Sequence, residues 1–332
     1  MSSAYVTGFA RYIPHKRVTN HELSSRLDTS DEWIYGHTGI RARYVVDAEE
    51  STSDLAIRAA KEALKISNTS AGSIDFLLLS TSTPDYPGNL PATACIVQDA
   101  IGASNAAALD IGNACSGFVY GLEVARSLVV SGSVDRVLFI CSEVYSRIVN
   151  WKDRNTCILF GDGAGAVLIS SEPSEKGLYG EISTAILGTD GSKSQALVRK
   201  AGESKFPMQA EEFPLDCSYI AMNGRKVFNF AVEIIPKLIR EVLEREKLRI
   251  GDIDVIVPHQ ANLRLIEATC RMHSIPRELF YSNISEYANT SSASIPIALV
   301  DVATEGVIKK GSIVLVLGFG AGFSYGASVI RF

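Results

Sequence analysis

The chain has 332 residues, of which 46% are hydrophobic and 21% are charged. A chain of this length and composition can bury a large core, and it predicts two domains or two fused halves. The net charge of −5 argues against nucleic acid as the principal ligand.

Targeting signals and cysteine usage indicate a reducing compartment. The N-terminus has no basic region leading into an apolar segment, so we expect no secretory signal. No apolar run is long and uninterrupted enough to span a bilayer, so we expect no membrane association. The cysteines lack the paired spacing of zinc sites or disulfide frameworks: they are Cys95, Cys115, Cys141, Cys157, Cys217 and Cys270. We therefore expect a cytoplasmic protein with no metal site.

The N-terminal part of the chain predicts a strand followed by helical segments. The strand covers residues 4–9, and the helical segments begin near residue 21, at Ser30 and at Thr52. Small or acidic residues stand at the cap and first turn of the last two, which is typical of a helix start. The continuous apolar run at 73–79 is typical of a strand buried on both faces.

The later part of the chain repeats the plan of the earlier part. The run at 252–257 is similar to the strand at 73–79, and each half closes on a Gly-rich strand, at 161–169 and at 325–330. One offset of 179 positions relates three pairs of residues: Asp75 and Asp254, Gly132 and Gly311, and Cys115 and Ser294. We interpret this pattern as an internal duplication.

The duplicated unit is of the βαβ type, and the two halves join near residues 172–180. Strands that alternate with helices predict a mostly parallel, covered sheet in each half. Active groups in such folds lie beyond the carboxyl ends of strands, so duplication brings two sets of them together. We also predict an insertion at 144–156, a mobile excursion over the site at 189–223, and a helix at 228–247 that Pro236 kinks.

Cys115 is the first candidate functional residue. The segment 118–130 predicts a helix buried on most sides, and Gly132 ends it. Cys115 would then lie on a strand-to-helix turn, beside unpaired backbone N–H groups and the positive end of the helix dipole. Both favour a thiolate, which can carry an acyl group. The alternative is that Cys115 is a small, buried apolar residue.

His259 and Asn289 are the other candidates. His259 directly follows the predicted strand at 252–257, where such folds place reacting groups, although a lone histidine is more often structural. Asn289 precedes the second-half helix, where it could simply be a cap. Cys, His and Asn in this order fit hydrolysis through an acyl-cysteine or acyl transfer to carbon. The papain-type pattern around the cysteine is missing, but side-chain types alone do not decide between them.

The motifs together resemble β-ketoacyl-[acyl carrier protein] synthase III, a family with the thiolase fold. The resemblance covers essentially the whole chain and separates it from elongating synthases that use Cys-His-His. It implies two thiolase-like halves, 1–175 and 176–332, in a layered αβαβα architecture. The motifs are Asp31–Ile34, Thr38–Arg41, Asn113–Phe118, Gly161–Ala166, His259–Arg264, Asn289–Ser294 and Gly320–Gly326.

The resemblance implies a ping-pong Claisen condensation without a cofactor. Cys115 takes an acyl group from acyl-CoA, and malonyl-acyl carrier protein then loses CO2 and attacks the acyl-cysteine. His259 and Asn289 supply Nε2–H and amide hydrogen bonds to the thioester enolate, which requires a neutral histidine. The backbone N–H groups of Cys115 and Ala321 form the oxyanion hole.

The family pattern also assigns residues to substrate binding. Trp33 and Arg154 would sandwich the adenine of CoA, with Gly224, Phe228 and Asn262 along the tunnel. Arg264 would lie near the tunnel mouth and, with Arg271 on the same helix, could meet an acidic carrier protein or simply face solvent. Two further positions bear on specificity: His37, where the family commonly has arginine, and Leu90, which would close the partner's acyl pocket across a homodimer.

The resemblance leaves two alternatives to an enzyme that starts fatty-acid synthesis. One is a specialised relative in secondary metabolism, for alkylquinolone-type or polyketide starter condensation, which His37 keeps open. The other is a non-catalytic partner subunit of a condensing complex. Retention of Cys115, His259 and Asn289 together argues against the second alternative.

Overall fold

The computed structural model describes residues 2–174, 177–207 and 215–332. Its strands are β1 Tyr5–Tyr12, β2 Lys16–Thr19, β3 Ala42–Val45, β4 Phe76–Ser80, β5 Ala107–Ile111, β6 Arg136–Val144, β7 Asp162–Ser170, β8 Gly180–Ile182, β9 Ile186–Thr189, β10 Leu197–Arg199, β11 Ile220–Met222, β12 Val255–Pro258, β13 Ile313–Gly320 and β14 Ser324–Arg331. Its α-helices are α1 Asn20–Ser24, α2 Asp31–Thr38, α3 Thr52–Ile66, α4 Thr93–Ala100, α5 Gly117–Val130, α6 Gly224–Glu246, α7 Leu263–His273, α8 Ile284–Tyr287 and α9 Ser294–Thr304.

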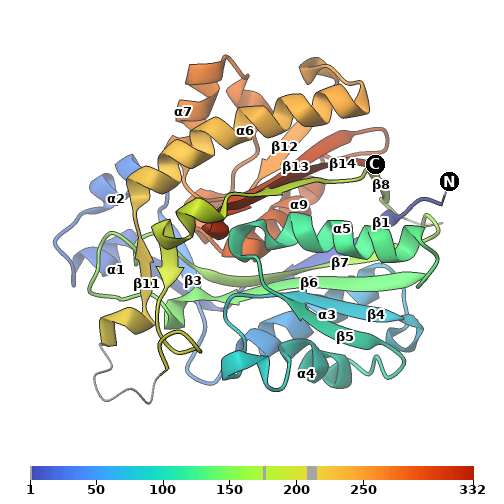
Figure 1. The fold of residues 1–332 in the computed structure, drawn as a ribbon, viewed down its shortest axis with the longest axis horizontal. Helices are drawn as coiled ribbons and strands as arrows, with labels where there is room; N and C mark the ends of the chain where they lie inside the picture. Colours follow the sequence, from blue (N-terminus) through green and yellow to red (C-terminus); the bar gives the residue numbers. More distant parts are fainter. Residues whose placement is uncertain (1, 175–176, 208–214) are drawn as a thin grey trace.

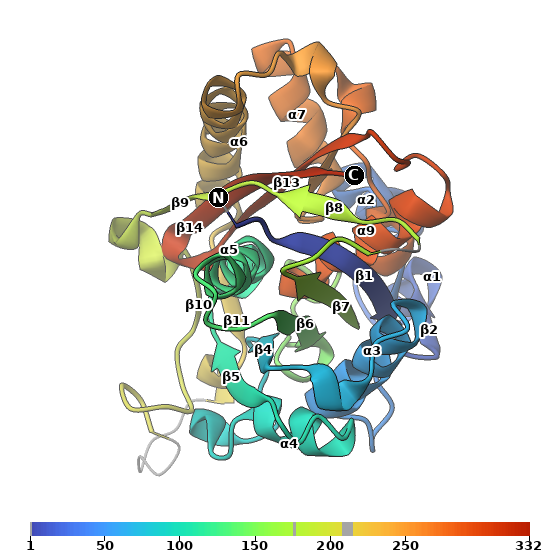
Figure 2. The same cartoon turned by 90° about the vertical axis from the view of Figure 1, so that its right-hand side faces the viewer.

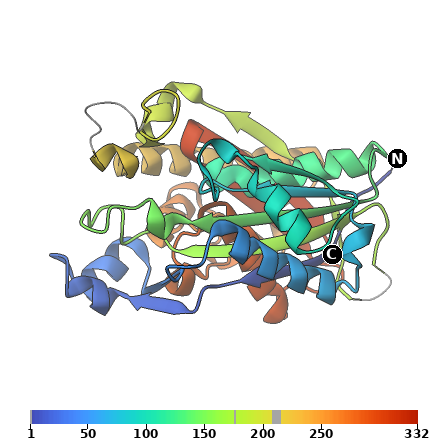
Figure 3. The same ribbon diagram turned by 90° about the horizontal axis from the view of Figure 1, so that it is seen from below.

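Helices and strands alternate in layers. In the part of the chain that the structure describes, the main sheet runs β12-β13-β14-β8-β1-β7-β6-β4-β5, with β9 beside β14. Helices α6 and α7 cover the β12–β14 side, α3 and α4 cover the β4–β7 side, and α5 and α9 lie between the two parts of the sheet (Figures 1 and 2). Figure 3 views the same layers from below, with α3 and α4 nearest the reader. The predicted αβαβα layering is confirmed.

Side-chain alternation along the strands separates the layers of the core. In β6, Val137 and Phe139 pack with α5 and α9, whereas Leu138 and Ile140 pack with α3 and α4. In β13, successive side chains alternate in the same way between the middle cluster and the cluster under α6 and α7. A continuous apolar run is therefore needed wherever a strand is covered on both faces.

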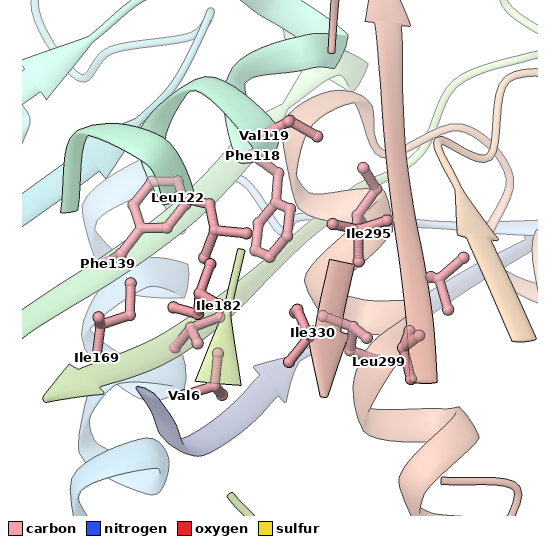
Figure 4. Packing of buried hydrophobic residues seen from close by; sticks show 14 of the residues in the cluster. Val6, Phe118, Val119, Leu122, Phe139, Ile169, Ile182, Ile295, Leu299 and Ile330 are labelled. Carbon is pink, nitrogen blue, oxygen red and sulfur yellow. The ribbon is translucent and has the colours of Figure 1, made fainter. Parts of the chain in front are cut away.

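The middle cluster joins the two halves of the chain. Figure 4 shows Phe118 and Leu122 of α5 facing the region of Ile295 and Leu299 of α9. All four side chains are at most 1% exposed. Burying such a side chain contributes about 1.5–3 kcal/mol, so this layer holds the starts of α5 and α9 in a fixed relation.

The two halves repeat the same order of elements. The first has β4, β5, α5, β6 and β7, and the second has β12, a bridge from Ile256 to Phe280, α9, β13 and β14. In both, the first strand pairs in parallel with the third. The predicted boundary between residues 175 and 176 lies outside the described residues, so the exact division into halves stays a prediction.

The prediction of a mostly parallel sheet in each half is wrong. Strand β6 pairs antiparallel with β7, and β13 pairs antiparallel with β14. No α-helix crosses between either pair: only the short turn Ala321–Phe323 separates β13 from β14. A direct return of this kind reverses the strand direction, whereas a helical crossover keeps it.

Three further segments were predicted from the sequence: a helix at 228–247, an insertion at 144–156 and an excursion at 189–223. Helix α6 continues through Pro236 from residue 224 to 246, four residues earlier than the predicted start. The predicted insertion at 144–156 begins with the 3-10 turn Tyr145–Arg147. The predicted excursion at 189–223 includes β10 and β11, which form their own small sheet, while its residues 208–214 lie outside the described residues.

Candidate active site

Cys115 lies just beyond the carboxyl end of β5, in the 3-10 turn Ala114–Ser116 that leads into α5. Ala114 has a φ of 45°, in the left-handed region, and so turns the chain sharply before the helix. The end of β13 packs directly against this turn. A Cβ atom at Gly320 would lie 2.6 Å from the Cys115 Cβ and 3.2 Å from its backbone nitrogen, so only glycine allows this approach.

The resting state of Cys115 differs from the sequence prediction. Burial raises the pKa of its thiol to about 12, and the nearby Glu143 carboxylate adds to this effect, whereas a hydrogen bond with Ser291 opposes it. The expectation that the helix end leaves a thiolate is therefore wrong for the free protein. With 3% of its surface exposed, the sulfur has lost the water that would solvate an anion. Cys115 rests as a thiol, and its proton must leave during reaction.

His259 follows the carboxyl end of β12 and is almost fully buried. Its backbone N–H donates to the Leu317 carbonyl at 2.7 Å, which fixes it to β13. Its ring packs against Phe319 in a T-shaped arrangement, with ring centroids 5.5 Å apart. Burial lowers the pKa of His259 to about 3, so the imidazole is neutral at physiological pH. A neutral histidine is the form that the sequence analysis required.

The Ser294 hydroxyl is a hydrogen-bond partner of the His259 ring. The His259 Nδ1 atom lies 2.7 Å from the Ser294 Oγ atom. That oxygen accepts the Gln260 backbone N–H at 3.3 Å, so its own proton is free to point at Nδ1. When the Ser294 hydroxyl donates to Nδ1, the imidazole proton lies on Nε2, where it can be donated to a ligand.

Asn289 is held by its backbone and by one side-chain atom. Its N–H donates to the Leu159 carbonyl at 2.9 Å, and its carbonyl accepts from Gly161 at 3.0 Å. The side-chain Oδ1 atom accepts the Ser291 N–H at 2.8 Å. Because the oxygen is engaged in this way, the Nδ2 amide group is the end of the side chain that remains to donate.

The structure brings several predicted residues to one cavity of about 120 Å³. These are Cys115, Gly224, Phe228, His259, Asn262 and Asn289, and Gly320 also lines it. Ala321, the predicted second oxyanion donor, directly follows Gly320. A buried sulfur, a neutral histidine and an amide donor facing one small cavity can bind and polarise an acyl group.

Trp33, His37 and Arg154 form a separate cluster on α2 and the loop after β6. The His37 ring stacks on Trp33, with centroids 4.2 Å apart and planes 24° apart. Its Nδ1 atom lies 2.7 Å from the Trp33 carbonyl oxygen. The Arg154 guanidinium lies 5.1 Å from the centre of the Trp33 ring. His37 therefore already stacks on the aromatic ring predicted to bind adenine.

Asn262 and Arg264 join the start of α7 to the end of α2. The Asn262 Oδ1 atom accepts the Arg264 N–H at 2.8 Å, and its Nδ2 group donates to the His37 carbonyl at 3.1 Å. Arg264 donates to the Gly36 carbonyl at 2.9 Å and to Glu267 at 2.8 Å. These acceptors hold the Arg264 guanidinium at the surface, and a contact of Arg264 and Arg271 with an acidic carrier protein stays a prediction.

Leu90 lies outside the cavity lining. It follows the turn Pro87–Asn89, and 83% of its surface is exposed. Gly224 and Phe228, by contrast, are on the first turns of α6, and Phe228 is 38% exposed while it lines the cavity.

Sequence reasoning missed several residues of the site. Ser291 lies against the Cys115 sulfur, Phe319 against the His259 ring, and Glu143 is buried behind both Ser291 and Ser292. Ser291, Ser292 and Ser294 lie within the motif Asn289–Ser294, and the offset of 179 positions also equated Ser294 with Cys115. The others stand in apolar or Ser-rich stretches, whose chemistry depends on contacts far apart in the chain.

The described residues contain neither a cluster of metal ligands nor a membrane-spanning helix. No group of three or more His, Cys, Asp or Glu side chains in them could hold a metal ion. No helix within those same residues is long and apolar enough to cross a bilayer. That the reaction needs no cofactor stays a prediction.

The fold is that of an α/β acyltransferase, in which a buried cysteine, a histidine and an asparagine line one cavity. Two family models match: 3-oxoacyl-[acyl-carrier-protein (ACP)] synthase III over residues 109–191, and its C-terminal counterpart over residues 243–332. The chain is 45% identical over 331 residues to the beta-ketoacyl-[acyl-carrier-protein] synthase III of Clostridium perfringens, covering 100% of both chains.

Solved structures agree with these matches. The 3-oxoacyl-[acyl-carrier-protein] synthase III of Aquifex aeolicus is similar with a TM-score of 0.88 and 39% identity, over 99% of this chain and 100% of that one. The priming β-ketosynthase of the R1128 polyketide pathway has a TM-score of 0.89 and 31% identity, over 99% and 96%. The chain belongs to the β-ketoacyl-[acyl carrier protein] synthase III family. It is a condensing acyltransferase with the thiolase fold, not a non-catalytic subunit, and the specialised alternative is not favoured.

Proposed function

We propose that this enzyme joins the acyl group of an acyl-CoA to malonyl-acyl carrier protein with loss of CO2, the step that starts type II fatty-acid synthesis. The observation that carries the proposal is the single cavity lined by Cys115, His259 and Asn289. In this proposal, His259 and Asn289 each donate from the side-chain nitrogen that is not already hydrogen bonded within the protein.

In the first half-reaction, the Cys115 sulfur attacks the thioester carbonyl of acyl-CoA. Negative charge develops on that carbonyl oxygen, and the backbone N–H groups of Cys115 and Ala321 stabilise it. The proximity of Gly320 to the Cys115 nitrogen supports this pairing, since it draws the end of β13 to the cysteine turn. Loss of one such donor typically costs on the order of 10²–10³ in rate.

In the second half-reaction, malonyl-acyl carrier protein loses CO2 and an enolate forms. His259 Nε2–H and the Asn289 amide donate to the enolate oxygen. Two observations support these roles: Ser294 occupies Nδ1 of His259, and Ser291 occupies Oδ1 of Asn289. A charged imidazole is not needed, and burial disfavours it. The carbanion carbon then attacks the acyl-cysteine and releases Cys115.

The CoA arm passes from the Trp33 cluster to the cavity. Adenine stacks on Trp33 beside Arg154, and Gly224, Phe228 and Asn262 line the path of the pantetheine. Because His37 stacks on Trp33, adenine either displaces that ring or uses the Arg154 side. Arg264 and Arg271, on α7, face the acidic carrier protein.

The enzyme acts as a homodimer through strand β5. This strand ends the main sheet and pairs with β4 alone in the part of the chain that the structure describes. Its residue Leu109 is 47% exposed, and an apolar edge strand of this kind is a template for pairing with another chain. Leu90, 83% exposed, would then reach the acyl pocket of the partner.

A reducing cytoplasm suits this chemistry. All six cysteines are free, which fits a compartment where thiols stay reduced and a cysteine nucleophile remains usable. We also propose that the reaction proceeds without a metal or cofactor, since groups of the chain itself supply the nucleophile and the hydrogen-bond donors that the two half-reactions require.

The proposal is tested by intact-protein mass measurement with acyl-CoAs of different length and branching. We expect the wild type to gain one acyl group on Cys115 and to release a β-ketoacyl product when malonyl-acyl carrier protein is added. Cys115→Ser should form no acyl-enzyme at neutral pH while keeping its fold by circular dichroism. Undiminished acylation of Cys115→Ser would contradict the assignment.

A further inference from the structure

Arg43 is a buried cation that the reaction scheme leaves without a role. It lies on β3 and is 0% exposed. Burial lowers its pKa to about 10, so the guanidinium stays charged at neutral pH. Its hydrogen bonds go to uncharged oxygens, and no carboxylate in the described residues forms an ion pair with it. Burying a cation without a counterion costs stability, so the contacts of Arg43 call for an explanation.

The guanidinium of Arg43 joins two segments that are far apart in the chain. Its Nη2 group donates to the Ile158 carbonyl at 2.7 Å, and its Nη1 group donates to the Asn20 Oδ1 atom at 2.8 Å. Asn20 is itself fixed, because its Nδ2 group donates to the Ile40 carbonyl at 2.7 Å and to Asp31 Oδ1 at 2.9 Å. A guanidinium is planar and its donors keep a fixed relation, so Arg43 holds Ile158 in place relative to this anchored asparagine.

The segment that the guanidinium reaches is residues 157–160, shortly before β7. These residues form turns rather than a helix or a strand, apart from an isolated bridge between Phe160 and Asn289. The Asn289 N–H donates to the Leu159 carbonyl at 2.9 Å, and the Gly161 N–H donates to the Asn289 carbonyl at 3.0 Å. The backbone of Asn289 is therefore bound to a segment whose own place depends on outside anchors such as the guanidinium.

Close packing supports the same connection. A Cβ atom at Gly161 would lie 3.2 Å from the Arg43 Cβ and 2.7 Å from the Tyr287 carbonyl oxygen, so β3, this segment and the chain before Asn289 are in direct contact. Two side chains of the segment, Leu159 and Phe160, also line the cavity. A shift of the segment would therefore move the cavity wall and the asparagine together.

We propose that Arg43 is a positioning residue for decarboxylation, because through Ile158 it holds the segment that places Asn289 at the cavity. The inference rests on the proposed function, in which the Asn289 amide donates to the enolate oxygen. Such a donor helps only when it lies at hydrogen-bond distance from the oxygen on which charge develops. Misplacing a group of this kind by about 1 Å can cost on the order of 10²-fold in rate.

Acylation of Cys115 should depend far less on Arg43. The cysteine turn is held by the close approach of Gly320 at the end of β13, a contact that does not involve residues 157–160. A merely structural role for Arg43 would instead lower stability and slow both half-reactions alike. The two roles can therefore be separated by comparing the half-reactions.

The experiment measures kcat for CO2 release from malonyl-acyl carrier protein, and the single-turnover rate of acylation by acyl-CoA, in two variants. Arg43→Met removes every donor, and we expect kcat for CO2 release to fall on the order of 10²-fold. Arg43→Lys keeps the charge, but an ammonium lacks the planar fork that reaches both acceptors, so a decrease on the order of tenfold should remain. Acylation should stay at the wild-type rate in both variants.

Arg126→Met is the matched control. Arg126 lies on α5 and its side chain is only 14% exposed, but it pairs with Glu123 rather than with residues 157–160. This variant should lose stability in urea unfolding while it keeps the wild-type ratio of the two rates. An equal decrease of both rates in Arg43→Met, or no decrease in either, would overturn the proposal.

Amide hydrogen exchange keeps this inference separate from the proposed function. The Asn289 and Gly161 amides donate across the bridge, so both should exchange on the order of tenfold faster in Arg43→Met than in wild type, while amides within β7 should not change. If the wild type releases no CO2 from malonyl-acyl carrier protein, the proposed function fails, whereas unchanged exchange at these two amides would overturn the role of Arg43. If Arg43→Met does not fold, as judged by thermal melting, Arg43→Lys carries both measurements.

Discussion

The starts of helices α5 and α9 occupy equivalent places in the duplicated fold but serve the reaction differently. Each follows a 3-10 turn that contains a residue in the left-handed region, Ala114 before α5 and Ser291 before α9. At the first the chain presents Cys115, and at the second it presents Ser294. The duplication thus supplies two similar helix ends, one that carries the proposed nucleophile and one that contacts His259.

The surroundings of the two ends differ in charge. The α5 end is buried and faces the Glu143 carboxylate, and both raise the pKa of the Cys115 thiol. The α9 end holds His259 in a neutral form, because burial lowers its pKa to about 3, and this form suits the proposed hydrogen-bond donor. The comparison implies that acylation and decarboxylation depend on separate parts of the site and can be impaired separately.

The larger effect that this comparison predicts is a slower decarboxylation when Ser294 is replaced. Ser294→Ala removes one hydrogen bond that holds the His259 tautomer, worth about 1–1.5 kcal/mol, so decarboxylation should slow about tenfold. Acylation of Cys115 should stay unchanged. Ser294→Thr, which keeps the hydroxyl, is the control. The measurement is CO2 release from malonyl-acyl carrier protein beside acyl-enzyme mass, and an equal loss in both would refute the separation.

A smaller effect should appear in stability. Burial raises the pKa of Glu143 from 4.5 to about 7, so the folded state binds its proton more tightly than the unfolded state does. The free energy of unfolding should therefore fall as pH rises from about 4.5 to about 7. Burial lowers the pKa of His259 from 6.5 to about 3, so its contribution is lost as pH falls from about 6.5 to about 3.

These opposite slopes can be separated with Glu143→Gln. Urea unfolding of this variant from pH 4.5 to 8 should lack the loss of stability on the alkaline side, whereas the loss on the acid side should remain. A variant whose unfolding free energy follows the wild-type curve across that whole range would show that Glu143 does not titrate in the folded protein.

Much of the fold could be predicted from local patterns. The repeated apolar runs and the offset between Asp75 and Asp254 indicated the duplication because both strands are buried on two faces. Strand direction could not be predicted in this way. The antiparallel return from β13 to β14 depends on the short turn Ala321–Phe323, and hydrophobicity does not encode direction.

Site residues could be predicted where a reactive side chain stands at the end of a predicted strand. Cys115 and His259 each follow the carboxyl end of a strand, where the sequence places a reactive side chain. The protonation state of Cys115 was not predictable, since it depends on total burial and on Glu143, which is 28 positions later in the chain. Ser291 was missed for the same reason: its role follows from contacts with Cys115 and Tyr145.

The most direct test of the account is to follow both half-reactions in His259→Ala. Intact-protein mass would report acylation of Cys115, and CO2 release would report decarboxylation of malonyl-acyl carrier protein. We expect acylation at the wild-type rate and a decrease in CO2 release on the order of 10²–10³-fold. An equal decrease in both half-reactions, or no decrease in either, would contradict the division of the site between Cys115 and His259.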